Sequence, residues 1–257
     1  MSNKQPNKRD RVKNAYNTMY KIKKSKIIRD IWRDAYEDDY PKEFDYDSFV
    51  TMTDLRDIVK YLNVGPNETF IDVGCGRGGP GMWIAREIGA DYVGIDLSDI
   101  ALEFAEQHAI QFGLEDKVSF QVGNICETSF TDNLFDGAIS IDTLTFVPDK
   151  LGAICEVARI LRPAASFVFT TWEQKKPNKF NDYRLLLSNA GFKVDLYKET
   201  LDWERRQRKV YQTILDSKDI LIKDMGEEGS RPWIREAQRG FPTLKYLKRI
   251  LVVAKKS

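Results

Sequence analysis

A cluster of glycines that follows a short apolar run is the most chemically informative part of this sequence. Residues 70–79 read FIDVGCGRGG, which places Gly74, Gly76 and Gly78 in alternation. Glycines permit tight backbone turns and close approach of a ligand to main-chain amides, and a helix N-terminus behind the turn adds partial positive charge. Gly74, Gly76 and Gly79 also satisfy the dinucleotide pattern GxGxxG, so a NAD site and another nucleoside site are both open at this point.

Features around these glycines favour a cofactor other than NAD. Asp72 stands two residues before the turn, where its carboxylate would repel a pyrophosphate but attract an ammonium group. Arg77 and Pro80 add bulk where a pyrophosphate would need bare backbone. Asp96 ends the next apolar segment and is placed to accept hydrogen bonds from ribose hydroxyls. Residues 124–125, Asn followed by Ile, suit the edge and the face of an adenine ring.

The elements that must position these residues alternate between strands and helices. The predicted strands are residues 69–73, 92–96, 118–122, 137–141, 166–171, 193–197 and 249–254. The predicted helices between them are residues 79–89, 98–112, 149–161 and 183–190. Strands separated by helical stretches of this kind indicate βαβ units and a parallel sheet, in which ligands bind beyond the carboxyl ends of the strands.

Four motifs together resemble the class I S-adenosylmethionine-dependent methyltransferases. They are DVGCGRG at 72–78, GIDLS at 94–98, FDG at 135–137 and LRP at 161–163. Within that superfamily the chain is similar to the small-molecule branch, which includes ubiquinone/menaquinone-biosynthesis and natural-product methyltransferases. Further stretches of this branch are IWRDAY at 31–36, FVT at 49–51 and RGGPGMW at 77–83. The resemblance covers roughly residues 30–200 and the final strand.

The resemblance implies which residues hold the cofactor, S-adenosylmethionine, and its product, S-adenosylhomocysteine. Asp72 and the turn at 74–78 would surround the methionine moiety, and Asp96 would hold the ribose. Leu97 and Ile125 would enclose the adenine. The predicted cofactor-binding residues are Asp72, Gly74, Cys75, Gly76, Gly78, Asp96, Leu97, Asn124 and Ile125. The family commonly has an acid at position 124, so the asparagine there is a departure.

The same resemblance gives the fold class and the domain organisation that we expect. The fold is α/β, with a Rossmann-like, mostly parallel seven-stranded sheet, helices on both faces and an antiparallel last strand. A basic, partly helical arm at 1–29 and a helical cap at 30–62 would precede the cofactor-binding domain at 63–199 plus 245–257. A helical lid or substrate insertion would occupy 200–244, with a short helix after Pro232.

Methyl transfer from a sulfonium needs alignment of a nucleophile and exclusion of water, and sometimes a base. Asp142 follows the fourth predicted strand and Glu173 the fifth, so either could act as a base or hold an ammonium group. The alternatives are that Asp142 orients a loop and that Glu173 is solvated. The single histidine, His108, lies inside a predicted helix, and no convincing metal-ligand cluster is present in the sequence.

Aromatic side chains outside the predicted sheet, or just beyond its strands, are candidates for the acceptor pocket. They suit an apolar substrate or, by cation–π attraction, an amine, although packing of a lid on the sheet would also explain them. The candidates are Tyr16, Tyr20, Phe49, Phe146, Trp172, Trp203, Tyr211 and Trp233.

The composition limits the classes of protein that remain. The 257 residues include 42% hydrophobic residues, three cysteines and no apolar run long enough to span a membrane or to act as a secretory signal. We therefore expect a cytoplasmic protein without a disulfide framework. The net charge of +1 hides a basic arm, since residues 1–29 carry +9 and the remainder carries −8. We expect the arm to fold over the acidic stretch near 34–47.

Three alternatives to a small-molecule methyltransferase remain open on sequence alone. The basic arm would suit an RNA or other nucleic-acid methyltransferase, but the Asn/Asp-Pro-Pro-Tyr/Phe motif of base N-methyltransferases is missing after the fourth strand. An NAD(P)-dependent oxidoreductase and a non-catalytic cofactor-binding scaffold are the others. We expect a small-molecule acceptor, no nucleic-acid partner and no membrane span, while the oligomeric state is not predicted.

Overall fold

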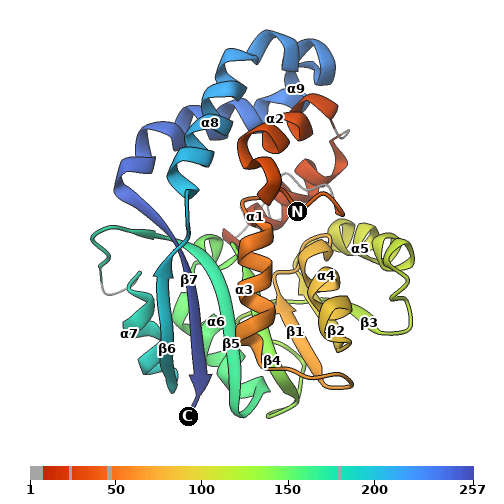
Figure 1. Ribbon diagram of the computed structural model, residues 1–257. Helices are drawn as coiled ribbons and strands as arrows, with labels where there is room; N and C mark the ends of the chain where they lie inside the picture. The colour runs from red at the N-terminus through yellow and green to blue at the C-terminus, as the bar shows by residue number, and fades with distance from the viewer. Residues whose placement is uncertain (1–7, 23–24, 45–47, 179–180) are drawn as a thin grey trace, which may run out of the picture.

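The strands form one seven-stranded sheet, and Figure 1 shows its strands lying side by side. The computed structural model describes residues 8–22, 25–44, 48–178 and 181–257. The strands are β1 (Thr69–Val73), β2 (Asp91–Asp96), β3 (Val118–Val122), β4 (Phe135–Ile141), β5 (Leu161–Gln174), β6 (Phe192–Glu199) and β7 (Leu247–Lys256). Their order is β3-β2-β1-β4-β5-β7-β6, and only β7 runs antiparallel to its neighbours. This confirms the predicted fold class.

The order of the strands places the carboxyl ends of β1, β2, β4 and β5 side by side. The pairing of Ile71 with Val93 and with Ala138 shows that β1 lies between β2 and β4. Its residues after Thr69 are buried, as expected for a parallel strand covered on both faces. The glycine turn therefore begins in the middle of this edge, next to the ends of β2 and β4.

Two layers of helices cover the two faces of the sheet. The helices of this part of the chain are α3 (Met52–Leu62), α4 (Gly79–Ile88), α5 (Asp99–Phe112), α6 (Lys150–Ile160) and α7 (Tyr183–Asn189), with the 3-10 turn η2 (Leu144–Phe146). Apolar side chains of α3, α4 and α5 pack on one face, together with Phe70 and Ile139. Those of α6 and α7 pack on the other face, together with Ile71 and Phe167. Burial on both faces holds the strand ends in a fixed arrangement.

A third apolar core lies above the carboxyl edge of the sheet, at the top of Figure 1. The elements above the sheet are α2 (Lys26–Tyr36), η1 (Glu37–Asp39), α8 (Trp203–Asp216), α9 (Lys218–Gly240) and η3 (Phe241–Tyr246). Trp32 of α2 and Val210 of α8 are among its buried residues. Two segments far apart in the sequence, α2 and α8, thus form one helical layer over the sheet edge.

The prediction of a helix beginning near Pro232 is wrong. The helix α9 already begins at Lys218, and its one interior break is at Gly226, where φ is 73° and ψ is 170°. Pro232 lies six residues beyond that break, inside the helix and past its first turn. The glycine, not the proline, therefore divides this segment.

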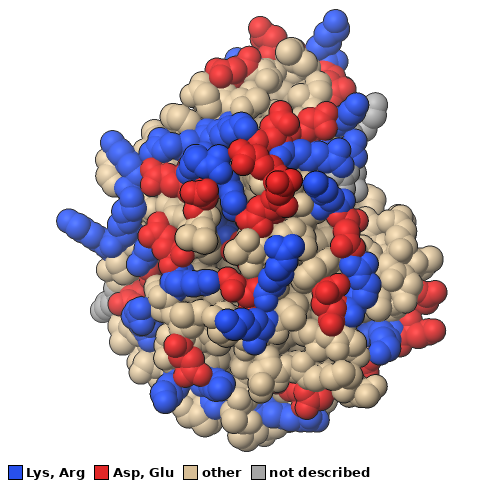
Figure 2. Space-filling view, in the orientation of Figure 1, with Lys and Arg blue, Asp and Glu red and all other residues tan. Residues whose placement is uncertain are grey.

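The basic N-terminal helix α1 (Lys8–Lys21) contacts α5. Residues 1–7, 23–24 and 45–47 lie outside the described ranges, so contact of the whole arm with the acidic stretch near 34–47 stays a prediction. The ammonium group of Lys13 lies 3.0 Å from the carboxylate of Asp99 at the start of α5. The acidic stretch pairs with α8, since Arg206 lies 2.9 Å from Asp39. Figure 2 shows acidic and basic side chains interspersed over the face that carries these elements. Charge pairing thus ties the layer of α2 and α8 together independently of α1.

No helix in the described ranges is both long enough and apolar enough to cross a membrane.

Candidate functional site

The glycine turn between β1 and α4 is held in a conformation that other residues rarely adopt. Gly74, Gly76 and Gly78 have φ of 85°, 54° and 74°. The amide of Gly74 donates to the carbonyl of Ile95 at 2.8 Å, and Thr143 Oγ1 donates to the carbonyl of Gly74 at 2.9 Å. A Cβ added to Gly74 would lie 2.2 Å from the side chain of Thr143. The turn is therefore fixed between the ends of β2 and β4.

Asp72 presents a buried carboxylate without a full set of partners next to this turn. Its side chain is 2% exposed, and Oδ1 has no hydrogen-bond partner among the described residues. The hydroxyl of Tyr92 lies 3.5 Å from Oδ2, which is a weak contact. Burial and, to a smaller extent, the nearby charge of Asp96 together raise the pKa of Asp72 to about 8. Such a group favours a cationic ligand, which would stabilise its ionised form.

Asp96 connects the end of β2 to the glycine turn. Its Oδ2 accepts from the amide of Gly76 at 2.9 Å, and its Oδ1 accepts from the amide of Ser98 at 2.8 Å. Burial raises the pKa of Asp96, while these backbone hydrogen bonds lower it. Each oxygen keeps a second lone pair, so the carboxylate can still accept hydrogen bonds from a diol.

The residues predicted to contact an adenine lie at the ends of β2 and β3. Ile125 is buried and Leu97 is half-buried. Asn124 uses Oδ1 to accept from the amide of Cys126 at 3.2 Å, which leaves its amide nitrogen as a donor. Cys75 is buried inside the turn, and burial raises the pKa of its thiol well above the ordinary value, so it is a poor nucleophile.

The N-terminal helix covers one side of the turn. A Cβ added to Gly76 would lie 3.0 Å from the hydroxyl of Tyr20. The guanidinium of Arg77 stacks 5.2 Å from the centre of the Tyr20 ring. Asn17 accepts a 2.5 Å hydrogen bond from the hydroxyl of Ser98. Tyr20 is thus beside the cofactor turn, whereas the side chain of Tyr16 lies outside the described part of the chain.

Asp142 is clamped by an arginine that the sequence reading missed. Arg249 of β7 donates through Nε and Nη2 to the two carboxylate oxygens of Asp142 at 3.1 and 3.0 Å, and through Nη1 to Asp54 at 2.7 Å. The arginine is 2% exposed. Burial raises the pKa of Asp54, and Arg249 opposes that shift. Both carboxylate oxygens of Asp142 are thus bonded by one guanidinium, and Asp142 directly precedes Thr143, whose hydroxyl donates to the glycine turn.

Glu173 lies on the face of β5 that α7 covers. Successive side chains of a strand face opposite sides, and Thr171, which has the same parity, contacts Tyr183 of α7 at 3.2 Å. Glu173 accepts from the hydroxyl of Tyr197 at 2.5 Å and lies 2.7 Å from the ammonium of Lys248. Its carboxylate is therefore paired on the α7 face of the sheet.

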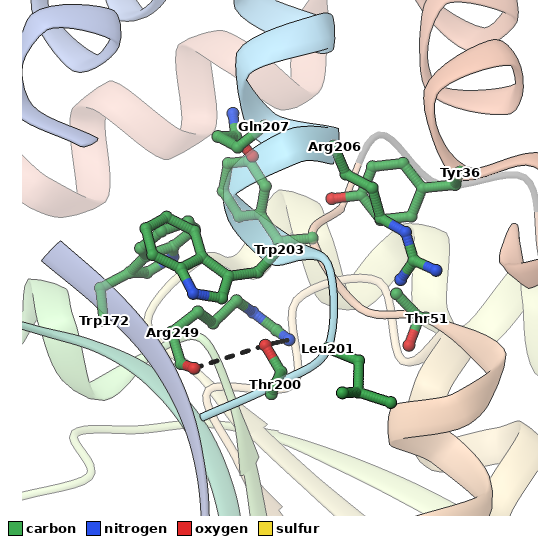
Figure 3. A pocket seen from close by; sticks show the side chains of 10 residues that line it. Tyr36, Thr51, Trp172, Thr200, Leu201, Trp203, Arg206, Gln207 and Arg249 are labelled. Carbon is green, nitrogen blue, oxygen red and sulfur yellow. Dashed lines mark hydrogen bonds between the residues drawn. The ribbon is translucent and has the colours of Figure 1, made fainter. Parts of the chain in front are cut away.

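The opposite face of β5 carries an aromatic pocket under α8, shown in Figure 3. Trp172 makes edge-on contacts with Phe49 and with Trp203, at 5.4 and 5.1 Å between ring centres. The pocket is lined in part by Tyr36, Phe49, Trp172, Trp203, Gln207 and Arg249. Its enclosed volume is about 10 Å³, the space of about one water molecule. Arg249 lies in the wall of the pocket and contacts Asp142, so the pocket adjoins the residue next to Thr143 and the glycine turn.

The remaining aromatic candidates lie elsewhere. Phe146 is 52% exposed on η2. Tyr211 is buried in the core above the sheet and donates to Glu236 at 3.1 Å. Trp233 packs edge-on against Trp32 at 5.7 Å. The structure therefore brings together Phe49, Trp172 and Trp203, but not these three.

His108 Nδ1 lies 3.2 Å from the carbonyl oxygen of Arg77, at the glycine turn. Among the described residues, no three His, Cys, Asp or Glu side chains form a group that could hold a metal ion.

Comparison with known proteins agrees with this arrangement of sheet and turn. A family model described as a methyltransferase domain matches residues 65–219. Methyltransferase GfsG of Streptomyces halstedii is 29% identical over 189 residues, which are 65% of this chain and 67% of that protein. The probable chloroplastic tocopherol O-methyltransferase of Oryza sativa subsp. japonica is 37% identical over 123 residues, 44% of this chain but only 34% of its own length.

A solved structure shares the fold over nearly the whole chain. The geranyl diphosphate C-methyltransferase of Streptomyces coelicolor A3(2) superposes with a TM-score of 0.67 at 15% identity, covering 98% of this chain and 99% of that one. The fold and the glycine turn define a class I methyltransferase. The chain belongs to the methyltransferase-domain family, which confirms the family predicted from the four motifs.

Proposed function

We propose that this chain transfers a methyl group from S-adenosylmethionine to a small-molecule acceptor by in-line displacement. The observation that carries the proposal is the buried Oδ1 atom of Asp72, which has no partner among the described residues and lies beside a turn of positive-φ glycines. A carboxylate in that setting fits the ammonium group of an amino-acid cofactor and does not fit a pyrophosphate.

The donor groups around the turn fit the remaining parts of that cofactor. Asp96 would accept from the ribose hydroxyls, Leu97 and Ile125 would enclose the adenine, and Asn124 would meet its edge. The residues at 74–78 would surround the methionine moiety, where glycines leave room beside the main chain. The cofactor, when bound, supplies a methyl group on a positively charged sulfur.

The chain's own contribution to the reaction is alignment and exclusion of water. Thr143 and the clamp of Asp142 by Arg249 fix the turn relative to the pocket wall. Trp172 and Trp203 close the pocket against solvent. Since Asp142 is ion-paired and Glu173 lies on the other face, we propose no protein base, so the acceptor would attack through an atom that is already nucleophilic.

The surface charge and the named relatives support a small acceptor rather than a nucleic acid. Charges of both signs alternate over the face drawn in Figure 2, whereas a nucleic-acid site would need a continuous basic surface. The relatives named above methylate small molecules, as far as their names state an acceptor. A cytoplasmic location and the domain limits given from sequence stay predictions.

Turnover tests the proposal directly. The full chain is incubated with S-adenosylmethionine and a panel of small phenols, alcohols, amines and prenyl compounds, and formation of S-adenosylhomocysteine is measured. We expect at least one acceptor to raise its formation above the acceptor-free rate, and Asp96→Ala to abolish that increase. Binding of S-adenosylhomocysteine without turnover on any acceptor would favour the scaffold alternative.

A further inference from the structure

Gln207 is a buried amide that the fold leaves incompletely paired. It lies on α8, is 1% exposed and lines the aromatic pocket in Figure 3. Neither its Oε1 nor its Nε2 reaches hydrogen-bond geometry with any described residue. Buried amides in folded proteins are nearly always paired, because an unpaired one loses its hydrogen bonds to water without replacement.

The neighbours of Gln207 determine which end of the amide faces the pocket. One turn further along α8, the Tyr211 hydroxyl donates its proton to Glu236 at 3.1 Å, so its oxygen can only accept a further hydrogen bond. Gln207 and Tyr211 are four residues apart on α8, so their side chains lie on the same face of that helix. An amide oxygen turned towards Tyr211 would set two acceptors against each other. The amide oxygen of Gln207 is therefore the atom directed towards the pocket, as Figure 3 shows.

Aromatic rings line the pocket around this oxygen, and the two arginines in its lining, Arg206 and Arg249, are ion-paired. Trp172, Trp203 and Phe49 form the apolar sides. Arg206 is ion-paired with Asp39 at 2.9 Å and stacks on Tyr36. An amide oxygen among ring faces attracts an O–H or N–H group and repels a carboxylate or phosphate oxygen.

We propose that Gln207 is the acceptor-recognising residue of this enzyme and that it accepts a hydrogen bond from an O–H or N–H group on a small aromatic acceptor. The inference rests on the proposed function and names the substrate class of the same site. The enclosed volume of about 10 Å³ has room for the donor group of the acceptor alone, and this group pairs with the amide oxygen.

The melting temperature distinguishes a recognition role of Gln207 from a structural role. Gln207→Leu replaces the unpaired amide by an apolar group of similar size. We expect the melting temperature to rise by about 2–4 °C, the shift that removal of one buried unpaired group gives in a chain of this size. Gln212→Leu is the matched control, since Gln212 is exposed on the same helix and bonds only Asp216. A lower melting temperature for Gln207→Leu than for wild type and Gln212→Leu would show that the amide is already satisfied, and would overturn the proposal.

Binding tests the recognition itself and needs no knowledge of the natural acceptor. Phenol and toluene have similar shape, but only phenol has an O–H group. Both are titrated by tryptophan fluorescence into the chain saturated with S-adenosylhomocysteine. We expect Gln207→Leu to reduce the phenol-to-toluene affinity ratio about tenfold and Gln212→Leu to leave it unchanged. An unchanged ratio in Gln207→Leu, or no phenol binding by wild type, would overturn the inference. Failure of the proposed function would instead be absence of turnover with every acceptor in the panel.

Discussion

Binding of the cofactor should release a proton from Asp72. In the ligand-free chain burial and the charge of Asp96 raise the pKa of Asp72 to about 8, so the carboxyl group is mostly protonated at neutral pH. An ammonium group placed beside Oδ1 would favour the ionised form, because opposite charges within a few ångströms lower the pKa of a carboxyl group by 1–3 units or more in a buried site.

The size of the release follows from that pKa. A group with a pKa of about 8 is about nine-tenths protonated at pH 7 and about one-tenth protonated at pH 9. If the bound ligand keeps Asp72 fully ionised, each binding event releases about 0.9 proton at pH 7 and about 0.1 at pH 9.

Isothermal titration calorimetry measures the number of protons released per binding event. S-adenosylhomocysteine is titrated into the full chain at pH 7 in phosphate and in Tris, whose heats of ionisation differ, and the difference in binding heat gives the number of protons released. The same titrations are repeated at pH 9. Asp72→Asn keeps the shape of the side chain but has no proton to release, so it isolates Asp72 from Asp96, whose pKa burial also raises.

Asp72→Asn should release fewer protons on binding than wild type. The number of protons released per binding event at pH 7 should be lower by about 0.9 in Asp72→Asn than in wild type. The variant should still bind the ligand, but with lower affinity. A wild-type release near zero at pH 7, or an equal release in Asp72→Asn, would refute the view that a cationic ligand meets this carboxylate.

Three further predictions follow from the same contacts. The free energy of unfolding of the ligand-free chain should fall as pH rises from 4 to 8, because the raised pKa of Asp72 makes the folded state bind more protons than the unfolded state. In urea unfolding, Asp72→Asn should reduce this dependence on pH by about 1.4 kcal/mol per pH unit, and an unchanged dependence would contradict the raised pKa. Arg249→Met should cost about 3–5 kcal/mol in the free energy of unfolding, since it leaves Asp54 and Asp142 buried without their cation, and a cost below about 1 kcal/mol would contradict the clamp. Gly74→Ala should weaken S-adenosylhomocysteine binding at least tenfold in calorimetry, because its Cβ would collide with Thr143; Gly113→Ala, with a similar positive φ and open space around it, should lose stability but keep its affinity.

The local parts of the site could be predicted from sequence because short motifs encode them. The turn after β1 needs positive φ at closely spaced positions, and the run DVGCGRG shows this directly. Asp96 ends the next strand, and β2 pairs with β1 in register, so its place beside the turn follows from the alternation of strands and helices. The helix at 52–62 was also predictable, since Thr51 and Asp54 form a capping box within four residues.

The contacts that depend on long-range packing could not be predicted. Asp54, Asp142 and Arg249 are far apart in the sequence, and only the sheet order brings them together. A signal was present in the sequence. Arg249 directly precedes the apolar run at 250–254, and a charged side chain beside such a run needs a buried partner of opposite charge. Trp172 and Glu173 must face opposite sides of β5 by parity, but sequence does not show which side carries the pocket.

The central claim is that the glycine turn and Asp96 bind S-adenosylmethionine rather than a dinucleotide. Calorimetric titration of wild type and Asp96→Ala with S-adenosylhomocysteine and with NADH tests it most directly. We predict that wild type binds S-adenosylhomocysteine but not NADH, and that Asp96→Ala binds it about ten- to a hundredfold more weakly. NADH binding by wild type, or equal affinity of the two proteins for S-adenosylhomocysteine, would contradict the assignment of this site.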